Sequence, residues 1–500
     1  MHHALEIQEI LLNVFSHLPP DDAAPELASL ARTCRAFKEP ALDVLWEELR
    51  DLSPLTRCLP ETSHQLSPDN RKRSFSRPLT QIEWDILQSY TGRIRIIANF
   101  NWGLDEKSVE IFSNPPTTEP LFPNVRKICC RYEGGTMDLL RLPLPSLVSV
   151  RVDLSHPHSL QDGLQSFSAF SPNITTLILG IGDRSDVAFD KLVSNCICQW
   201  QNLQIVRCPK ISLDAVALAH LSRMPVLSEL SFKQTITFPN CISPLVFSNL
   251  STFVLDSTSL GPISQLLSLI LLPVIKHFRL TAASCPSRQE LSSFLAAVHS
   301  SNADHTIEHF ILDQLSHPGY LVRSEAPLLC FEHLQSCMAF GNLRNLSFDI
   351  EWNVGLTNND LLALASAWPN LEYLAINDGW GWNTPDGITP NGLLQLLQTN
   401  PSLKAVSLVM GTRGYTEVPL GLTWPDHRDH LYIDVLDSII EADSVPAITA
   451  FFAGITSCCK FVNSYAWIGG LFVKPPGWEV YSDRWEDIWR RAQVAIRPHS

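Results

Sequence analysis

Apolar residues recur along most of the chain in one short phrase, in which the first and second apolar residues are separated by two positions and the second and third by one. Clear copies are PSLVSVRVD (145–153), PNITTLILG (172–180), PVLSELSFK (225–233), PNLEYLAIN (369–377) and PSLKAVSLV (401–409). The alternating end of the phrase has the period of a β-strand with one buried face. The pattern therefore predicts a series of short strands whose apolar triplets point into a core.

The copies follow one another in order along the chain. Steps between first positions range from 22 residues, Val125 to Leu147, to 36 residues, Ile307 to Leu343. The segment HLYIDVLDS (430–438) is an imperfect further copy. The eleven predicted triplets are Val125/Ile128/Cys130, Leu147/Val150/Val152, Ile174/Leu177/Leu179, Leu203/Val206/Cys208, Leu227/Leu230/Phe232, Leu250/Phe253/Leu255, Ile275/Phe278/Leu280, Ile307/Phe310/Leu312, Leu343/Leu346/Phe348, Leu371/Leu374/Ile376 and Leu403/Val406/Leu408.

Between the copies the apolar spacing becomes helical, as in residues 212–224, 357–370 and 389–402. Thr357 is a candidate helix N-cap, and Pro369 is a stop signal. Each unit is thus predicted to run strand, turn, helix, turn. One such unit cannot bury its own apolar faces, whereas stacked units share a continuous core. The alternative is a set of unrelated short strands in an ordinary α/β protein.

The phrase and its spacing resemble the leucine-rich-repeat superfamily over about residues 120–440. The resemblance implies an α/β fold, a horseshoe-shaped leucine-rich-repeat solenoid. The chain lacks the regular Asn or Cys three places after the triplet that supplies the asparagine ladder of that family. We therefore expect irregular repeats and irregular curvature.

Residues 4–50 lack the phrase and instead carry three short amphipathic patterns of helical period. Pro19 and Pro20 end the first pattern, and Pro25 lies near the start of the second. The apolar positions are Ile7, Ile10, Leu11, Val14, Phe15 and Leu18 in the first helix, Leu27, Leu30, Ala31 and Cys34 in the second, and Ala41, Leu42, Leu45, Trp46 and Leu49 in the third.

This N-terminal segment resembles the F-box motif. The resemblance is carried by Glu9-Ile10-Leu11-x-x-Val14-Phe15-Ser16-x-Leu18, by Leu27-x-x-Leu30-Ala31-x-x-Cys34-Arg35-x-Phe37, and by Leu45-Trp46. Gln8 replaces a proline common in the family, and the middle segment is longer than usual. The alternative is an amphipathic cap for the solenoid. With the repeats, the pattern resembles fungal-type F-box/leucine-rich-repeat substrate receptors of SCF ubiquitin ligases.

The resemblance implies a non-catalytic substrate-recognition subunit whose F-box docks the Skp-type adaptor of a cullin ligase, while the repeats bind a protein substrate. The alternative is a leucine-rich-repeat interaction scaffold with no ubiquitin connection. The resemblance implies that a set of apolar residues supplies both the core of the helices and the contact with the adaptor. These residues are Ile10, Leu11, Val14, Phe15, Leu18, Leu45 and Trp46.

Four segments follow from these patterns. Residues 1–55 are the predicted F-box-like helical domain, and residues 56–118 a connector and N-terminal cap. Residues 119–440 are the predicted solenoid. Residues 441–500 are the predicted C-terminal cap, in which Trp485, Ile488 and Trp489 share one helical face, and the alternative is a tail that returns to the concave face.

Charge and hydropathy narrow the class of partner. The 500 residues carry a formal net charge of −14, which argues against a nucleic-acid partner because such binders need a clustered basic face. The longest apolar stretch, residues 266–278, is interrupted by Pro273 and Lys276 and is shorter than the roughly 20 residues of a bilayer span, so no membrane partner is expected. With no secretory signal, the thirteen cysteines read as reduced thiols of a cytoplasmic or nuclear protein.

The sequence offers little support for catalysis. It has no glycine-rich phosphate loop, no H-E-x-x-H and no G-x-S-x-G. The close cysteine pairs at 196–198 and 458–459 lack zinc-finger spacing and read as buried thiols. DHRDH (426–430) reads as a polar loop, with metal binding as the alternative. We expect no enzyme, no metal and no cofactor.

The repeats do suggest where a protein substrate would bind. Side chains that alternate with the buried triplets are expected on the concave face of the sheet, which is polar with recurring acidic groups. Two loops near its C-terminal end carry tryptophans, which are favoured binding anchors. The predicted substrate site is Asp349, Trp352, Tyr373, Asn377, Trp380 and Trp382. The alternative is that the tryptophan rings pack against one another over the solenoid edge.

Overall fold

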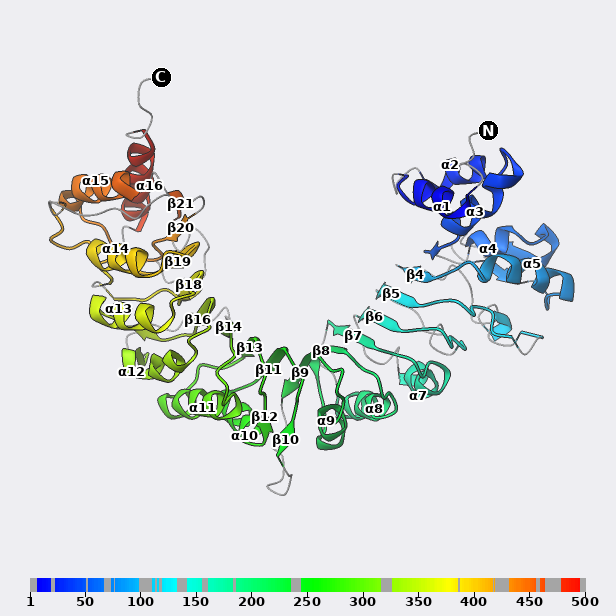
Figure 1. Cartoon of the computed structure of the whole chain (residues 1–500), viewed down its shortest axis with the longest axis horizontal. Coiled ribbons are helices and arrows are strands. Elements are labelled where there is room, and N and C mark those ends of the chain that lie inside the picture. The colour runs from blue at the N-terminus through cyan, green and yellow to red at the C-terminus, as the bar shows by residue number, and fades with distance from the viewer. Residues whose placement is uncertain are drawn as a thin grey trace. The chain divides into compact units, whose positions relative to one another are not determined.

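The architecture comes from a computed structural model, whose helices and strands Figure 1 labels. It divides into two units, Met1–Phe232 and Lys233–Ser500. The structure describes residues 7–18, 23–50, 53–66, 73–75, 77–98, 110–112, 115–116, 119–132, 142–154, 161–182, 186–234, 244–315, 326–384, 387–416, 418, 431–455, 459–463 and 478–494.

Unit 1 begins with three helices, α1 (Gln8–Ser16), α2 (Ala23–Leu30) and α3 (Arg35–Leu45). Leu11, Phe15, Leu27 and Ala41 form their buried core. The rings of Phe15 and Phe37 meet edge to face with centroids 5.6 Å apart. The core is small, as the sequence predicts, so these helices depend on the chain that follows.

That chain ties the helices to a parallel sheet. It continues through β1 (Glu48–Leu49), α4 (Ser53–Arg57), the 3-10 turn Glu61–Ser63, the antiparallel pair β2 (His64–Leu66) and β3 (Arg73–Phe75), α5 (Gln81–Thr91) and β4 (Ile96–Ala98). β1 pairs in parallel with β4, and β4 with β5. Arg93 bridges Glu39 and Asp43 of α3. The sheet therefore starts immediately after α3, well before residue 119.

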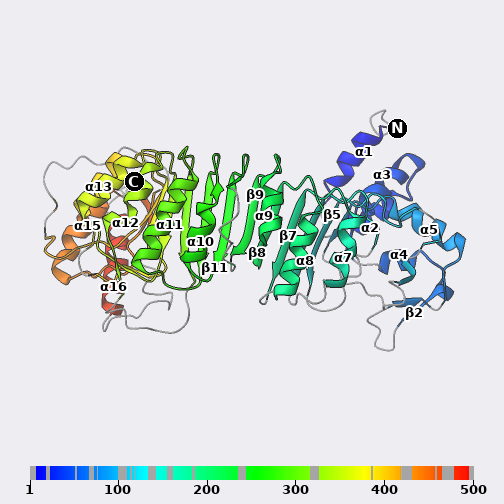
Figure 2. The ribbon, with the colours of Figure 1, turned by 90° about the horizontal axis from the view of Figure 1, so that it is seen from below.

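The strands that follow in unit 1 are β5 (Lys127–Tyr132), β6 (Ser149–Leu154), β7 (Thr176–Ile181) and β8 (Ile205–Ser212). They pair in parallel in chain order. Helices α7 (Gln161–Phe170), α8 (Val187–Ile197) and α9 (Ala215–Ser222) lie on one side of the strands (Figures 1 and 2). β9 (Glu229–Gln234) spans the boundary between the units.

Unit 2 continues the same alternation of strands and helices. Its main strands are β11 (Thr252–Ser257), β13 (His277–Ala282), β14 (His309–Gln314), β16 (Asn345–Asp349), β18 (Tyr373–Ile376), β19 (Ala405–Ser407), β20 (Leu431–Asp434) and β21 (Cys459–Asn463). Each pairs in parallel with the next. β21 extends the sheet beyond residue 440, into the segment predicted as a cap.

Helices α10 (Leu260–Ser268), α11 (Arg288–Ser301), α12 (Phe331–Leu334), α13 (Asn358–Ala367) and α14 (Pro390–Thr399) lie on one side of these strands (Figure 1). Two further short parallel pairs are separate from the main sheet: β10 (Leu245–Val246) with β12 (Ile270–Leu271), and β15 (Leu328–Leu329) with β17 (Asn353–Val354). Short 3-10 turns cover Gln335–Ala339 and Ala442–Ser444. The chain ends in α15 (Val445–Ile455) and α16 (Trp478–Val494), where Trp485 is buried and donates from Nε1 to Ser438 O at 2.9 Å.

The repeat prediction is confirmed. All 33 side chains of the eleven predicted triplets are buried to 3% exposure or less. The register stacks them directly, for example Phe253, Phe278, Phe310, Leu346, Leu374 and Val406 across successive strands. Helices α9, α13 and α14 lie where helical spacing was predicted. The fold is an α/β solenoid of leucine-rich-repeat type.

Polar side chains in the turns before β8, β18 and β19 bond to the preceding repeat. Trp200 Nε1 donates to Ser171 O at 2.9 Å, and Trp368 Nε1 to Cys337 O at 3.0 Å. Asn400 Nδ2 donates in turn to Trp368 O at 2.7 Å. Each bond satisfies a buried carbonyl of the preceding repeat, so neighbouring repeats are joined by polar contacts as well as by apolar packing.

Candidate functional site

A stripe of exposed apolar residues on α1 is the first candidate interaction surface. Ile7, Ile10 and Val14 are 43%, 39% and 55% exposed. Spacings of three and four place them on one side of the helix. Leu11 and Phe15, which directly follow Ile10 and Val14 in sequence, turn into the domain core. An exposed apolar stripe on a small polar domain is typical of a protein-binding surface.

Burial separates the residues that were predicted to form the adaptor contact and the helical core into exposed and buried positions. Ile10 and Val14 are exposed, whereas Leu11 and Phe15 are buried. Leu18 and Leu45 are half-buried against the same core, and Trp46 is buried with its ring 4.7 Å from that of Tyr90 in α5. Ile7, immediately before α1, was not among the predicted contacts although it lies on the helical stripe seen in the sequence.

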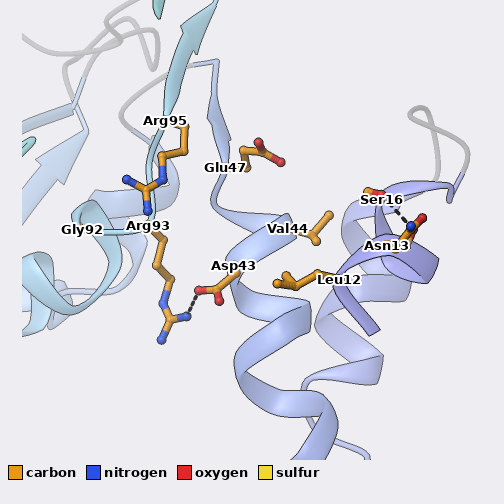
Figure 3. Close-up of a pocket in the computed structure, with 9 residues that line it drawn as sticks. All are labelled: Leu12, Asn13, Ser16, Asp43, Val44, Glu47, Gly92, Arg93 and Arg95. Carbon is orange, nitrogen blue, oxygen red and sulfur yellow. Dashed lines mark hydrogen bonds and ion pairs between the residues drawn. The ribbon is translucent and has the colours of Figure 1, made fainter. Parts of the chain in front are cut away.

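A cavity of about 460 Å³ lies between α1, the end of α3 and the segment after α5 (Figure 3). Leu12 and Val44 contribute apolar walls, while Glu47, Arg93 and Arg95 contribute charges of both signs. Figure 3 shows Arg93 turned to Asp43, with which it forms an ion pair. This mixture of charge and apolar surface selects no single class of ligand.

The second candidate surface is the side of the unit 2 sheet away from helices α10–α14, called the exposed face below. Its side chains alternate with the buried triplets. His277, Arg279 and Tyr373 are exposed, and His309, Asn345, Ser347, Ala375, Ser407 and Asp434 are half-buried. The face combines rings, small residues and charges.

The predicted tryptophan anchors are not on this face, and that part of the prediction is wrong. Trp352 and Trp382 are fully buried, and Trp380 is nearly so. Trp352 Nε1 donates to Pro286 O at 3.0 Å, and Trp382 Nε1 to Ile376 O at 2.6 Å. Trp352 directly precedes β17, which pairs with β15, and its ring meets that of His333 in α12 edge to face with centroids 5.2 Å apart. The indoles are structural.

Asn377 is also a structural residue. It is fully buried, with a left-handed φ of 53°. Its Oδ1 accepts the backbone N–H of Ile350 at 3.0 Å, and its Nδ2 donates to Trp352 O at 2.7 Å. An asparagine side chain both tolerates this backbone conformation and bonds the neighbouring loop. Of the six predicted substrate residues, Tyr373 is exposed and Asp349 is half-buried.

Carboxylates near the C-terminal ends of the unit 2 strands lie in a poorly solvated environment. Burial, with repulsion from Asp378, raises the pKa of Asp349 to about 7. Burial likewise raises the pKa of Asp434 to about 6 and moves the pKa values of Asp313 and Asp378 upward. Asp349 and Asp434 accept backbone N–H groups, so both brace loops.

Within the described residues, no group of three or more His, Cys, Asp or Glu side chains is placed to hold a metal ion. Burial raises the pKa of the Cys196 thiol to about 11 and that of Cys208 to about 12, so both thiols stay protonated and unreactive at neutral pH.

DHRDH (426–430) and Cys458 lie outside the described residues. In the described part of the chain, no helix has the length and apolar character needed to cross a membrane.

Comparison with known proteins bears on the N-terminal helices. A family model described as F-box-like matches residues 8–51, which hold α1, α2, α3 and β1. The N-terminal helices are an F-box-like domain. The alternative of a simple cap for the solenoid is therefore set aside. No curated protein matches the chain.

Among solved structures, the chain is similar to the leucine-rich-repeat ectodomain of the plant membrane receptor kinase GASSHO1/SCHENGEN3 from Arabidopsis thaliana, solved in complex with CASPARIAN STRIP INTEGRITY FACTOR 2. The identity is 13% and the TM-score 0.31, over 85% of this chain and 48% of that one. The chain thus spans about half the length of that ectodomain. F-box domains generally bind Skp-type adaptors and leucine-rich repeats generally bind proteins, so the two parts together support a protein-interaction role.

Proposed function

We propose that this F-box-like protein is the non-catalytic substrate-recognition subunit of an SCF-type ubiquitin ligase, acting in the cytoplasm or nucleus. In this role α1 docks a Skp-type adaptor that links the chain to a cullin, and the leucine-rich repeats hold a protein substrate. The chain contributes binding and placement, and it makes or breaks no bond itself.

The observation that carries the proposal is the apolar stripe of Ile7, Ile10 and Val14 on a domain that matches the F-box-like model. A domain with so small a core gains stability when a partner covers exposed apolar surface. Burying three aliphatic side chains on association is worth several kcal/mol at about 25 cal/mol per Å². The stripe therefore has the chemistry of a partner-docking surface.

Substrate binding is assigned to the repeats because their parallel strands carry an exposed face of rings, small polar groups and charges. Tyr373 is exposed on this face and lies under Lys404, whose Nζ is 5.9 Å from the ring centroid. Solenoid repeats present such surfaces on rigid strands, which lowers the ordering cost of binding.

The proposal is tested with a variant that changes only exposed residues, Ile10→Asp with Val14→Asp. Full-length protein is mixed with a purified Skp-type adaptor, and complex formation is followed by co-purification and calorimetry. A matched control, Gln8→Glu with Asn13→Asp, adds the same two charges at exposed α1 positions off the stripe. Leu11 and Phe15 are unsuitable targets because both are core residues.

We expect the stripe variant to lose adaptor binding by at least a hundredfold while its thermal unfolding matches that of the control. Wild-type protein that does not bind the adaptor would refute the ligase role and leave the interaction scaffold as the better description. Equal adaptor binding by both variants would show that α1 is not the docking surface.

A further inference from the structure

Five charged residues alternate in sign along the edge of the exposed face where the strands begin. Lys276, Glu308, Arg344, Glu372 and Lys404 each immediately precede one of the successive strands β13, β14, β16, β18 and β19. The strand residues that follow them are register partners, so the five charges form one row. We call this row the charge ladder.

The ladder is joined by ion pairs between neighbouring strands. Lys276 Nζ lies 2.9 Å from Glu308 Oε1, and Arg344 NH1 lies 2.9 Å from Glu372 Oε1. Arg344 Nε is 3.8 Å from Glu308 Oε2, and Lys404 pairs with Glu372. Each carboxylate thus lies between two cations.

The cations and the carboxylates are not equally accessible. The side chains of Lys276, Arg344 and Lys404 are 54%, 51% and 54% exposed, whereas those of Glu308 and Glu372 are 26% and 17% exposed. Hydrogen bonds from Lys276 and Lys404 hold the pKa values of the two glutamates below their ordinary value, so both stay ionised. The carboxylates therefore orient three cations that each remain about half exposed and carry more donors than these ion pairs use.

A further ion pair of the same kind joins β13 and β14 on the exposed face, beyond the ladder residues Lys276 and Glu308. Arg279 NH2 lies 2.8 Å from Asp313 Oδ2, with the guanidinium again the more exposed partner. Flat rings lie beside these cations: Tyr373 under Lys404, and the stacked pair His277 and His309, with centroids 4.3 Å apart. Although the whole chain carries a net charge of −14, the more exposed partner of each of these ion pairs is the cation.

The spacing of the cations restricts the form of a ligand. Successive ladder cations are two strands apart, and strands in a sheet are about 4.8 Å apart, so the cations recur at roughly 9.6 Å. A polyproline II segment rises about 3.1 Å per residue with three residues per turn, which places every third side chain on one side at about 9.3 Å. A β-strand covers a similar distance in three residues but turns alternate side chains to opposite faces.

We propose that this edge of the exposed face binds an extended, polyproline II-like segment of the protein substrate with an anionic group at every third residue, one for each of Lys276, Arg344 and Lys404. This inference rests on the proposed function and names its substrate class. Carboxylates of Asp or Glu and phosphates on Ser or Thr share the required chemistry, and the arginine at the centre can bond either in a bidentate manner.

The test uses full-length protein and four labelled nine-residue peptides, proline-rich and measured by fluorescence anisotropy at low and high salt. One has Glu at positions 2, 5 and 8, and a second has phosphoserine at the same positions. A third has the composition of the first with Glu at positions 4, 5 and 6. A fourth has Lys at positions 2, 5 and 8.

We expect the period-three anionic peptides to bind at least tenfold more tightly than the clustered isomer, the lysine peptide not to bind, and salt to weaken binding. Binding by the phosphoserine peptide alone would identify phosphorylated segments as the source of charge, and binding by both would show that carboxylates suffice. Equal binding of the isomer, preference for lysine, or no binding would overturn the proposal.

Arg344→Gln supplies the matched variant, because Glu308 keeps Lys276 and Glu372 keeps Lys404, so no carboxylate is left unpaired. We expect it to weaken the period-three peptides about tenfold, or about 1.4 kcal/mol. Arg288→Gln, exposed at the start of α11 on the helix side, should leave binding unchanged. Unchanged peptide binding by Arg344→Gln would overturn the assignment of the ladder.

Adaptor binding measured on the same preparation reports on α1 alone, so a failure of the proposed ligase role is seen separately from a failure of the ladder assignment.

Discussion

Asp349 holds the backbone of Trp380 in place across two repeats. Its Oδ1 accepts the N–H of Trp380 at 3.1 Å and that of Gly379 at 3.0 Å. Asp349 ends β16, whereas Trp380 lies in the loop after β18, so the carboxylate of one repeat braces the loop of the next. A Cβ at Gly379 would collide with the same carboxylate, which explains a glycine there.

The charge on this brace makes the protein less stable above neutral pH. The pKa of Asp349 is raised from 3.8 to about 7 by burial, with Asp378 adding repulsion. A carboxyl whose folded-state pKa is raised lowers stability above that pKa, and the cost disappears as pH falls from 7 toward 4. We predict that Asp349→Asn, which keeps the Oδ1 acceptor, stabilises the protein at pH 8 by on the order of 3 kcal/mol.

Urea unfolding of wild type and Asp349→Asn at pH 8 and pH 5 checks this prediction. The gain at pH 5 should be less than half the gain at pH 8, because the folded-state carboxyl is largely protonated at pH 5 while the unfolded-state carboxyl is not. Asp304→Asn, at an exposed position, should change stability at neither pH. An equal gain at both pH values would show that the stabilisation does not come from removing the charge.

Replacing Trp382 by alanine should lower the free energy of unfolding far more than replacing Tyr373 by alanine. Trp382 is fully buried and donates to Ile376 O, while its backbone N–H donates to Asp437 Oδ1 at 2.9 Å. We predict that Trp382→Ala costs about 3–5 kcal/mol of unfolding free energy, because it leaves a cavity and an unpaired carbonyl. Tyr373→Ala, on the exposed face, should cost less than about 1 kcal/mol. Denaturant unfolding of both variants measures the difference, and equal costs would contradict these burial assignments.

The repeat core was predictable because its signal is local and repeated. Leu371, Leu374 and Ile376 show their burial through alternation within six residues, and ten other copies repeat it. The same reasoning located α13 between Thr357 and Pro369, since the cap and the stop are both local features.

The tryptophans were misassigned because their burial depends on distant pairings. Trp352 directly precedes β17, which pairs with β15, and its indole Nε1 donates to the carbonyl of Pro286, 66 residues earlier. The loop of Trp382 is held by Asp437, 55 residues later. No periodicity within either loop reports such contacts. In α1, apolar residues occupy two neighbouring sides of one helix, so spacing alone did not separate the core residue Leu11 from the exposed Val14.

Those two positions on α1 give a prediction about stability independent of any partner. Leu11 is buried among Phe15, Leu27 and Ala41, whereas Val14 is more than half exposed. Leu11→Ala should destabilise the three helices by about 2–4 kcal/mol, and Val14→Ala by less than about 0.5 kcal/mol. Hydrogen exchange of peptides from residues 8–45 measures opening of this domain separately from the repeats. Equal protection in the two variants would contradict the assignment of core and surface.

Glu83 should make unit 1 sensitive to acid. It is buried, pairs with Arg77 NH2 at 2.8 Å and closes a capping box with Thr80 at the start of α5. The hydrogen bond from Arg77, with others from Ser63 and Thr80, holds the pKa of Glu83 far below its ordinary value despite burial. A carboxyl whose folded-state pKa is depressed contributes stability at pH above about 4.3, and that contribution is lost as pH falls further.

We predict that Glu83→Gln costs about 1.5–3 kcal/mol of unfolding free energy at pH 7, because a buried charged hydrogen-bond partner is lost. The difference from wild type should shrink below pH 4 in urea unfolding, while the exposed control Glu61→Gln changes little at any pH. A cost for Glu83→Gln that is the same at pH 7 and pH 3 would show that its role is packing and not charge.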